Sequence, residues 1–294
     1  MSLKLESFLE RKGFLEKFDN YLFDCDGVLW EGDHVFPGII EAMQLLRNAG
    51  KKVFFVTNNS TKSREAFLQK FKKLGIEANL DEIFSSAVAT AAYLKHILQF
   101  PADKKVYIIG MSGIQHELEA MDIRCCGGEA DNGPFDNEIV KNDPEVGAVV
   151  VGLDTQVNYK KYNKAFTYLR NNTGCYFIMT NQDSTFPVHG TLQPGAGSIA
   201  APLITALNRQ PDAILGKPAQ NMMDTIFAEY KLDRERTCMI GDRLDTDIDF
   251  GLKGGVETLC VLTGVTSEEE ILSKENNIVP TYYIRGFADF VVEP

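Results

Sequence analysis

The sequence predicts an α/β fold in which a parallel-sheet core carries a second, smaller α/β domain as an insertion. Apolar runs of strand length end in polar residues or glycine and alternate with amphipathic segments of helix length, which is typical of parallel sheets with helical crossovers. A second series of strands and helices starts near residue 100, and the first pattern resumes after residue 208. A chain of 294 residues, 44% hydrophobic and 24% charged, is long enough for two globular domains.

The first predicted strand covers residues 21–23 and is followed by Asp24, Cys25, Asp26 and Gly27. Ligands of open parallel sheets bind at the carboxyl ends of the strands, so this loop is a candidate binding site. Residues two positions apart on an extended backbone point the same way, and the carboxylates of Asp24 and Asp26 are therefore expected to share one space. Two adjacent carboxylates repel unless a cation or a proton lies between them, which favours a hard divalent metal such as Mg²⁺. An acidic turn without a metal explains the same residues, so this loop alone leaves both interpretations open.

The rest of the core is predicted as an alternation of helices and strands. Helices are expected at 37–50, 63–74 and 222–230, and strands at 52–56, 213–215, 237–240 and 259–262. Ser63 is the expected N-cap of the second helix, and Gly50 and Gly75 stand where the first two helices are expected to end. The strand at 259–262 is the last one expected in the core.

The insertion is predicted to be an α/β domain in its own right. Its strands are expected at 105–110, 147–152 and 176–180 and its helices at 113–121 and 159–170, with a long polar loop at 127–143. A glycine-rich turn at 194–198 precedes a helix that ends near residue 208. We therefore assign residues 1–100 and 209–294 to the core domain and residues 101–208 to the inserted domain.

Four predicted strands end in chemically useful side chains. These are Asp24 with Asp26, Thr57 with Asn58, Lys217, and Asp242 with Asp247. Because the carboxyl ends of parallel strands lie along one edge of a sheet, residues far apart in sequence are expected to meet there. A carboxylate can act as a nucleophile, further carboxylates can bind a metal, and a hydroxyl, backbone amides and a lysine can hold phosphate oxygens. The combination predicts phosphoryl transfer.

A family resemblance rests on five segments of the sequence: FDCDGVLW, VTNNSTKSR, GKP, GDRLDTDI and the later LTGVT. In order and spacing they resemble the motifs of the haloacid dehalogenase (HAD) superfamily of phosphatases. The closer resemblance is to the eukaryotic 4-nitrophenyl phosphatase and phosphoglycolate phosphatase group, which is related to pyridoxal phosphate phosphatase. It extends from about residue 18 to the C-terminus. It implies a Rossmann-like core domain with an inserted α/β cap of the C2 type.

The resemblance implies catalytic and metal-binding roles for the matching acidic residues. Asp24 would attack the phosphorus atom and become an aspartyl phosphate. Asp26 would protonate the leaving oxygen and then activate the water that hydrolyses the intermediate. The carboxylates of Asp24 and Asp242 and the backbone carbonyl of Asp26 would bind Mg²⁺.

The same resemblance implies which residues bind the phosphoryl group. Thr57, Asn58 and Asn59 would hold its oxygens, chiefly through the Thr57 hydroxyl and the Asn58 amide. Lys217 would balance its charge, and Asp247 would orient either Lys217 or a water molecule on the metal. The implied enzyme is a HAD-type phosphoric monoester hydrolase.

The inserted domain is implied to be a cap that closes over the active site and selects the substrate. Residues 180–184 follow a predicted strand and resemble the family's substrate-facing segment, which makes Asn181 and Asp183 candidate substrate-binding residues. A polar turn explains the same two residues equally well. Caps of this type commonly form homodimer contacts, so a homodimer through the cap is expected.

The leading substrate is 2-phosphoglycolate, with 4-nitrophenyl phosphate as an artificial substrate and with pyridoxal phosphate or a phosphoprotein as alternatives. A signalling receiver uses similar residues but has no second domain. A phosphotransferase or a dehalogenase is the nearest enzymatic rival, although a dehalogenase gives Asp26 and Asp242 no role. Outside enzymes, the alternative is a catalytically silent protein that binds a phosphorylated ligand or acts as a scaffold.

Composition argues against a nucleic-acid partner and does not argue against a small phosphorylated substrate. The net charge of -11 is unlike the basic surface of a nucleic-acid-binding protein. No apolar run approaches the ~18 residues of a membrane span, and the charged first 17 residues do not resemble a secretory signal. The six cysteines form no CxxC pair and lie mostly in apolar runs, as expected for reduced thiols in a cytoplasmic protein.

Overall fold

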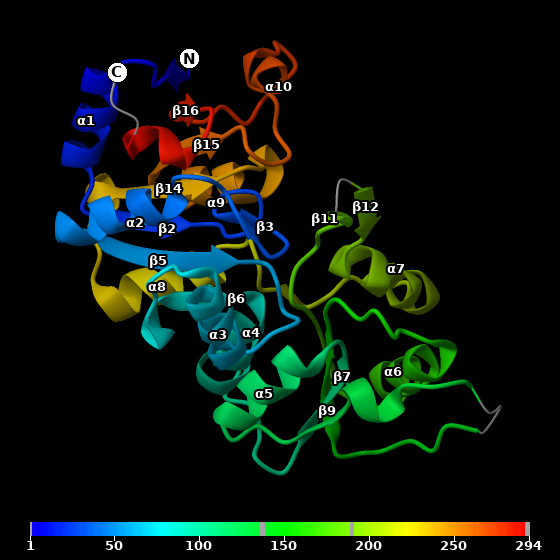
Figure 1. Ribbon diagram of the computed structural model, residues 1–294. Coiled ribbons are helices and arrows are strands. Elements are labelled where there is room, and N and C mark those ends of the chain that lie inside the picture. Colours follow the sequence, from blue (N-terminus) through cyan, green and yellow to red (C-terminus); the bar gives the residue numbers. More distant parts are fainter. Residues whose placement is uncertain (1, 136–138, 189–190, 292–294) are drawn as a thin grey trace. The chain divides into compact units, whose positions relative to one another are not determined.

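The computed structural model describes residues 2–135, 139–188 and 191–291 and divides into two compact units (Figure 1). The core unit consists of 1–57, 68–84 and 217–294, and the inserted unit consists of 58–67 and 85–216. The predicted insertion at 101–208 lies within the inserted unit, which also takes in 58–67, 85–100 and 209–216. Each unit is built on a parallel sheet, so the predicted α/β fold is confirmed.

The core unit is organised around a seven-stranded sheet. Its strands are, in spatial order, β1 (Leu3–Lys4), β16 (Tyr282–Ile284), β15 (Glu257–Val261), β14 (Thr237–Gly241), β2 (Asn20–Phe23), β5 (Lys52–Thr57) and β6 (Ile83–Ser85). Strand β2 pairs in parallel with β14 on one side and β5 on the other. All four residues of β2 are buried, as expected for a strand covered on both faces. The carboxyl ends of β14, β2 and β5 therefore lie side by side.

The prediction that the strand at 259–262 is the last core strand was wrong. Strand β15 was expected to be the last, but β16 pairs with it and β1 pairs with β16, both in parallel. The two additional strands are only three and two residues long. Segments of this length are too short to show a periodic pattern, and tertiary pairing alone makes them strands.

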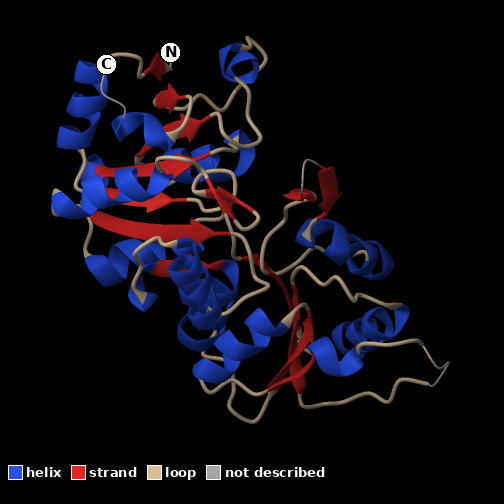
Figure 2. Cartoon of the chain, in the orientation of Figure 1, coloured by secondary structure: helices blue, strands red, loops and turns tan. Residues whose placement is uncertain are grey.

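Helices lie on both sides of the core strands (Figure 2). They are α1 (Phe8–Lys17), α2 (Ile39–Asn48), α3 (Arg64–Leu74, whose residues from 68 on belong to the core unit), α8 (Asn221–Tyr230), α9 (Asp249–Lys253) and α10 (Glu268–Leu272). A short antiparallel pair, β3 (Trp30–Glu31) and β4 (His34–Val35), follows the first loop. The predicted helices at 37–50, 63–74 and 222–230 correspond to α2, α3 and α8. In α2 the apolar residues Ile39, Met43 and Leu46 form the buried side, which is the amphipathic pattern that predicts the helix.

The inserted unit has its own five-stranded parallel sheet. In spatial order its strands are β13 (Ala213–Ile214), β10 (Tyr176–Met179), β9 (Val146–Val151), β7 (Lys105–Ile109) and β8 (Cys125–Gly127). The strand before Lys217 was expected in the core sheet, and this expectation was wrong because β13 pairs with β10. A two-residue strand carries too little pattern to reveal which sheet it joins.

In the described part of the inserted unit, four α-helices and a hairpin accompany the sheet. They are α4 (Ser86–Ala92), α5 (Ser112–Ala120), α6 (Tyr159–Asn171), α7 (Ala196–Leu207), and the antiparallel strands β11 (Thr185–Val188) and β12 (Thr191–Pro194). The predicted helices at 113–121 and 159–170 correspond to α5 and α6, whereas α4 and the hairpin were not expected. The predicted loop at 127–143 contains one helical turn at Gly128–Asp131, and its residues 136–138 lie outside the described part.

Two further observations concern the helices and the cysteines. None of the helices in the described ranges combines the length and the apolar character that crossing a membrane requires. All six cysteines are free thiols, and Cys25, Cys175, Cys238 and Cys260 are buried.

Candidate active site

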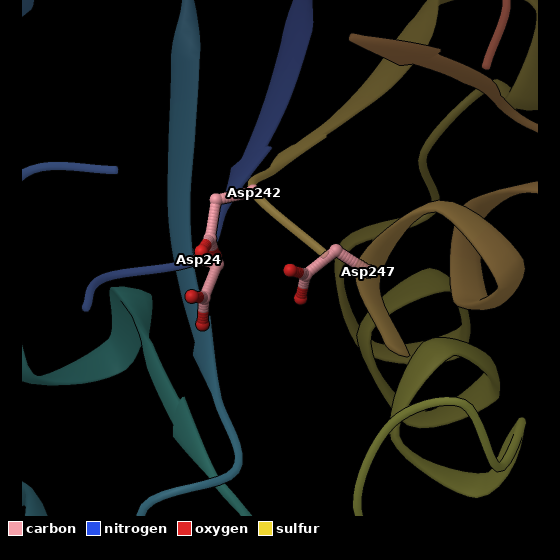
Figure 3. Close-up of side chains that lie close together, drawn as sticks. All are labelled: Asp24, Asp242 and Asp247. Atoms are coloured by element: carbon pink, nitrogen blue, oxygen red, sulfur yellow. The ribbon is translucent and has the colours of Figure 1, made fainter. Parts of the chain in front are cut away.

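Three carboxylates meet at the carboxyl ends of the central core strands. Asp24 follows β2, and its backbone N–H donates to the carbonyl of Ile240 on β14 at 2.8 Å. Asp242 follows β14, and Asp247 lies on the helical turn Leu244–Ile248. Figure 3 shows the three side chains close together. One carboxylate oxygen from each residue lies within 4.8 Å of the other two. They are 9%, 3% and 1% exposed, respectively.

The ammonium group of Lys217 is buried beside this acidic cluster. It donates to Asp24 Oδ1 at 2.6 Å, to Asp247 Oδ1 at 2.6 Å and to the carbonyl oxygen of Val56 at 2.7 Å. These contacts can use all three of its donors. Lys217 is 1% exposed, so the contacts form in a region of low dielectric constant. The side chain therefore orients both Asp24 and Asp247.

The charges of this cluster do not balance. Three carboxylates and one ammonium group carry a net charge of −2 when all are ionised. Burial, with the nearby charge of Asp247, raises the pKa of Asp242 to about 7, and burial also raises the pKa of Asp24 well above its usual value. Burial alone would lower the pKa of Lys217, but the charges of Asp24 and Asp247 raise it. Oxygen donors with two excess negative charges suit a hard divalent cation, so the residues present fit Mg²⁺.

Glycines and backbone amides shape the space around Asp242. A Cβ on Gly27 would lie 2.6 Å from Asp242 Oδ2, and the φ of Gly27 is +85°, which disfavours any other residue. A Cβ on Gly264 would clash with the same oxygen. The backbone N–H of Val265 donates to Asp242 Oδ2 at 2.8 Å, and that of Arg243 donates to Asp247 Oδ2 at 3.1 Å. The LTGVT segment, which contains Gly264 and Val265, thus positions a carboxylate.

Asp26 is not part of the three-carboxylate cluster within the described residues. Its Oδ1 accepts a hydrogen bond from the indole Nε1–H of Trp30 at 2.8 Å and lies 3.8 Å from Lys70 Nζ. Strand β2 ends at Phe23, and the turn that follows is closed by the backbone N–H of Leu29, which donates to the Cys25 carbonyl at 2.9 Å. That the carboxylates of Asp24 and Asp26 share one space stays a prediction.

The phosphate-binding candidates from the second motif occupy the end of β5 and the turn after it. Thr57 is the last residue of β5 and is 2% exposed. In the inserted unit, the Asn58 side-chain N–H₂ donates to both carboxylate oxygens of Asp183, at 3.2 and 3.0 Å. Asn59 Oδ1 accepts from both the backbone and the hydroxyl of Thr61, which fixes the turn locally.

Asn181 and Asp183, the predicted substrate-binding pair, both hold Asn58. Asn181 Nδ2 donates to the Asn58 carbonyl at 2.9 Å, and its Oδ1 accepts from the backbone N–H of Asp183 at 3.1 Å. The hydroxyl of Ser86 donates to the same Asn58 carbonyl at 2.6 Å. The pair therefore stabilises the turn of the second motif that follows β5, and direct contact with a substrate remains a prediction.

Sequence reasoning missed two neighbours of Asp26. Trp30 is the single tryptophan of the chain and lies four residues after Asp26, which is a signal that could have been used. Lys70 lies on α3 among several other lysines, and nothing in the sequence distinguishes it. Its place beside Asp26 follows only from the packing of α3 within the core unit.

Comparison with known proteins defines the class to which this fold and site belong. The sequence model of the haloacid dehalogenase-like hydrolase family matches residues 21–124 of this chain. A second family model, described as HAD-hydrolase-like, matches residues 214–290. The first match contains Asp24, Asp26 and Thr57, and the second contains the remaining members of the acidic cluster with Lys217. Both halves of the site thus come from hydrolase segments.

The relatives narrow the class further. The chain is 48% identical to the 4-nitrophenylphosphatase of Schizosaccharomyces pombe over 98% of each chain. It is 43% identical to phosphoglycolate phosphatase 2 of Arabidopsis thaliana over 99% of this chain and 98% of that protein. The solved glycerol phosphate phosphatase of Mycobacterium tuberculosis, in complex with magnesium, has a TM-score of 0.78 and 27% identity, with 97% of this chain and 78% of that chain covered.

This chain belongs to the haloacid dehalogenase-like hydrolase family. Within it, the chain falls among proteins named as phosphatases and is a phosphoric monoester hydrolase by class. The sequence resemblance is therefore confirmed, as is the expected architecture of a parallel-sheet core with an inserted cap.

Proposed function

We propose that this protein is a Mg²⁺-dependent phosphatase of small phosphate monoesters that works through an aspartyl phosphate on Asp24. The observation that carries the proposal is the buried cluster of Asp24, Asp242, Asp247 and Lys217, which would carry two excess negative charges with all four groups ionised. Such charges are costly to bury unless a ligand compensates them. A divalent cation together with a phosphoryl group is a ligand of this kind.

The metal site is assigned to two carboxylates and one carbonyl. The carboxylates of Asp24 and Asp242 and the backbone carbonyl of Asp26 would hold Mg²⁺, while Asp247 is engaged by Lys217. When bound, the cation would offset the charge of the phosphoryl group and of the carboxylates around it. The solved magnesium complex of the glycerol phosphate phosphatase supports the choice of metal.

In the first step a carboxylate oxygen of Asp24 attacks phosphorus. The bond between Asp24 and phosphorus forms while the bond from phosphorus to the ester oxygen breaks. Asp26 acts as the general acid and gives a proton to the departing oxygen, so that the product leaves with a hydroxyl group instead of as an alkoxide. Lys217 keeps Asp24 in place through the 2.6 Å hydrogen bond to Oδ1.

In the second step water releases the phosphate. Asp26, now ionised, takes a proton from a water molecule whose oxygen attacks phosphorus, and the bond to Asp24 breaks. Inorganic phosphate leaves, and both carboxylates return to their starting protonation states. The Thr57 hydroxyl and the backbone amides of Asn58 and Asn59 are proposed to hold the phosphoryl oxygens in both steps.

The leading substrate is 2-phosphoglycolate, supported by the 43% identity to a protein named phosphoglycolate phosphatase. The 4-nitrophenylphosphatase relative supports 4-nitrophenyl phosphate as an artificial substrate, and the glycerol phosphate phosphatase adds glycerol phosphate as a competitor. Pyridoxal phosphate and phosphoproteins are the further alternatives. All are monoesters, so the same steps apply to each.

The test is phosphate release from a panel of these esters, with and without Mg²⁺, by the wild-type protein and Asp24→Asn. We expect Mg²⁺-dependent release that is strongest with 2-phosphoglycolate and is absent in the variant, because Asn cannot form the acyl phosphate. Phosphate release by Asp24→Asn at the wild-type rate would refute the role of Asp24 as the nucleophile. No release from any ester by the wild type would favour a silent phospholigand-binding protein.

The proposal extends to the setting of the enzyme. We propose that the inserted unit acts as the substrate-selecting cap and that the protein is a homodimer through it, in the cytoplasm. Six free cysteines support a reducing compartment. Tyr159 on α6 and Leu192 on β12 are 67% and 66% exposed, which makes them candidates for a dimer contact. Analytical ultracentrifugation of the wild type and Tyr159→Glu tests the assembly, and a monomeric wild type would refute it.

A further inference from the structure

The side chain of Asp26 is held by a tryptophan and a lysine that the proposed mechanism does not otherwise use. Its Oδ1 accepts from Trp30 Nε1 at 2.8 Å, and Lys70 Nζ lies 3.8 Å from the same oxygen. The Asp26 side chain is 39% exposed, whereas the members of the acidic cluster are buried. A partly exposed carboxylate rotates readily unless its neighbours fix it, so these contacts decide its orientation.

Trp30 is a rigid donor because the core packs around its ring. The residue is fully buried, and its ring meets Phe71 edge-on at a centroid distance of 4.9 Å. Phe71 in turn packs against Phe55 of β5 at 4.3 Å. The backbone N–H of Gly27 donates to the Trp30 carbonyl at 2.8 Å, which ties the backbone of Trp30 to the loop that carries Asp26. The direction of the indole N–H is therefore set before any substrate binds.

Lys70 completes the arrangement from helix α3. Its Nζ lies 4.3 Å from the centroid of the Trp30 ring, within the range of a cation–π contact. Its side chain is 11% exposed, so most of its length is packed against the core. The ammonium group of Lys70 thus lies close to both the indole ring of Trp30 and the carboxylate of Asp26, which are the two partners of one hydrogen bond.

We propose that Trp30 and Lys70 are positioning residues for the acid–base group Asp26. By engaging Oδ1, they direct Oδ2 to exchange the proton, first with the leaving oxygen and then with water. This inference rests on the proposed phosphatase function and adds to it the residues that orient its acid. Holding an acid in the productive direction removes an entropic cost from the proton transfer.

The leaving group provides the discriminating test. An alkoxide leaves only with protonation, so cleavage of 2-phosphoglycolate needs a well-oriented acid, whereas 4-nitrophenolate is a stable anion that needs little help. Trp30→Phe keeps the ring and removes the donor. We expect it to lower kcat/KM for 2-phosphoglycolate about tenfold or more and that for 4-nitrophenyl phosphate less than about threefold, because kcat/KM reports the first chemical step.

Lysine substitutions on one helix supply a matched comparison. Lys70→Met should show the same leaving-group dependence as Trp30→Phe, and Asp26→Asn should show it more strongly. Lys73→Met is the control, because Lys73 lies on α3 but is 68% exposed and pairs with Asp33. It should leave both rates unchanged. Equal losses for the two esters, or no loss, in both Trp30→Phe and Lys70→Met would overturn the proposal.

A spectroscopic measurement separates this inference from the proposed function. Because Trp30 is the single tryptophan, its indole N–H gives one resonance in a ¹⁵N-resolved NMR spectrum. Asp26→Ala should move that resonance upfield and speed its exchange with solvent, since the hydrogen bond is lost. An unchanged resonance would overturn the inference even in an active enzyme. If the wild type hydrolyses no ester, the proposed function fails, and the positioning role fails with it even where the resonance moves.

Discussion

Lys217 Nζ and Asp24 Oδ1 lie 2.6 Å apart, although the two residues are 193 positions apart in the chain. The same ammonium group lies 2.6 Å from Asp247 Oδ1, so one lysine links the nucleophile candidate to a second acid. Both contacts are buried. The lysine is therefore expected to matter for the stability of the site as much as for its chemistry.

Removal of the ammonium group tests this double role. Lys217→Met should lower kcat by about 100-fold or more, because it removes a preorganised charge from the reaction site. It should also lower the free energy of unfolding by about 3 kcal/mol, since breaking a buried ion pair leaves uncompensated charge. Urea unfolding and steady-state kinetics check the two effects. Lys253→Met, which alters an exposed lysine on α9, is the control and should change neither; an equally stable Lys217→Met would contradict the argument.

Mg²⁺ should stabilise the folded protein through the acidic cluster. At a free concentration 100 times its dissociation constant, a cation that binds only the folded state adds about 2.7 kcal/mol. Asp242→Asn should remove most of the rise in unfolding temperature that Mg²⁺ causes in the wild type. Asp245→Asn is a matched control, because Asp245 lies three residues further along, is 66% exposed at its side chain and pairs with Arg243. Differential scanning calorimetry measures the unfolding temperatures. If Mg²⁺ raised the unfolding temperature of both variants equally, the proposed metal site would be refuted.

Replacement of Asp183 should lower kcat/KM by the same factor for every phosphate ester. Its carboxylate accepts from the Asn58 side chain at 3.0 and 3.2 Å, and Asn58 belongs to the motif proposed to bind the phosphoryl group. Asp183→Ala should lower kcat/KM about tenfold or more, by the same factor for each ester, because misplacing a binding group is costly. Asp183→Asn keeps one oxygen that can accept the hydrogen bond from Asn58, so its kcat/KM should fall less than that of Asp183→Ala. A loss that changes with the leaving group would instead support the predicted contact with the substrate.

The acid stability of the inserted unit should depend on Asp131. Burial alone raises the pKa of Asp131, but hydrogen bonds from Lys164 at 2.5 Å and from the Tyr107 hydroxyl at 2.8 Å lower it overall. A pKa lowered by folding means that the stabilisation is complete above the unfolded pKa of about 4 and is lost as the pH falls through the folded value.

Asp131→Asn should accordingly destabilise the protein by about 2 kcal/mol at pH 7, and the difference from wild type should shrink below about pH 4. Urea midpoints measured between pH 7 and pH 3 follow the change. Asp122→Asn, at a side chain that is 95% exposed, serves as the control. A difference for Asp131→Asn that stays constant over this range would show that ionisation of the carboxylate is not responsible.

The strongest predictions from sequence concern long segments with a clear period. The helices α2, α5 and α6 and the strands β5, β7 and β9 begin and end within about two residues of the expected positions, because an amphipathic or wholly apolar run has one favourable way to be buried. The short strands β1, β8, β13 and β16 were missed or assigned to the wrong sheet. Their few residues have no period, and pairing with neighbours alone decides their state.

The sequence by itself determined the chemistry that gathers at the central strands. Asp24, Thr57 and Asp242 directly end or follow β2, β5 and β14, and adjacent parallel strands bring their carboxyl ends together whatever lies between them. Only the tertiary structure decided how the side chains pair. Asp26 contacts Trp30 and Lys70, and Asp183 accepts a hydrogen bond from Asn58. The spacing of these residues in the sequence does not predict such contacts, because they depend on how turns and helices pack in three dimensions.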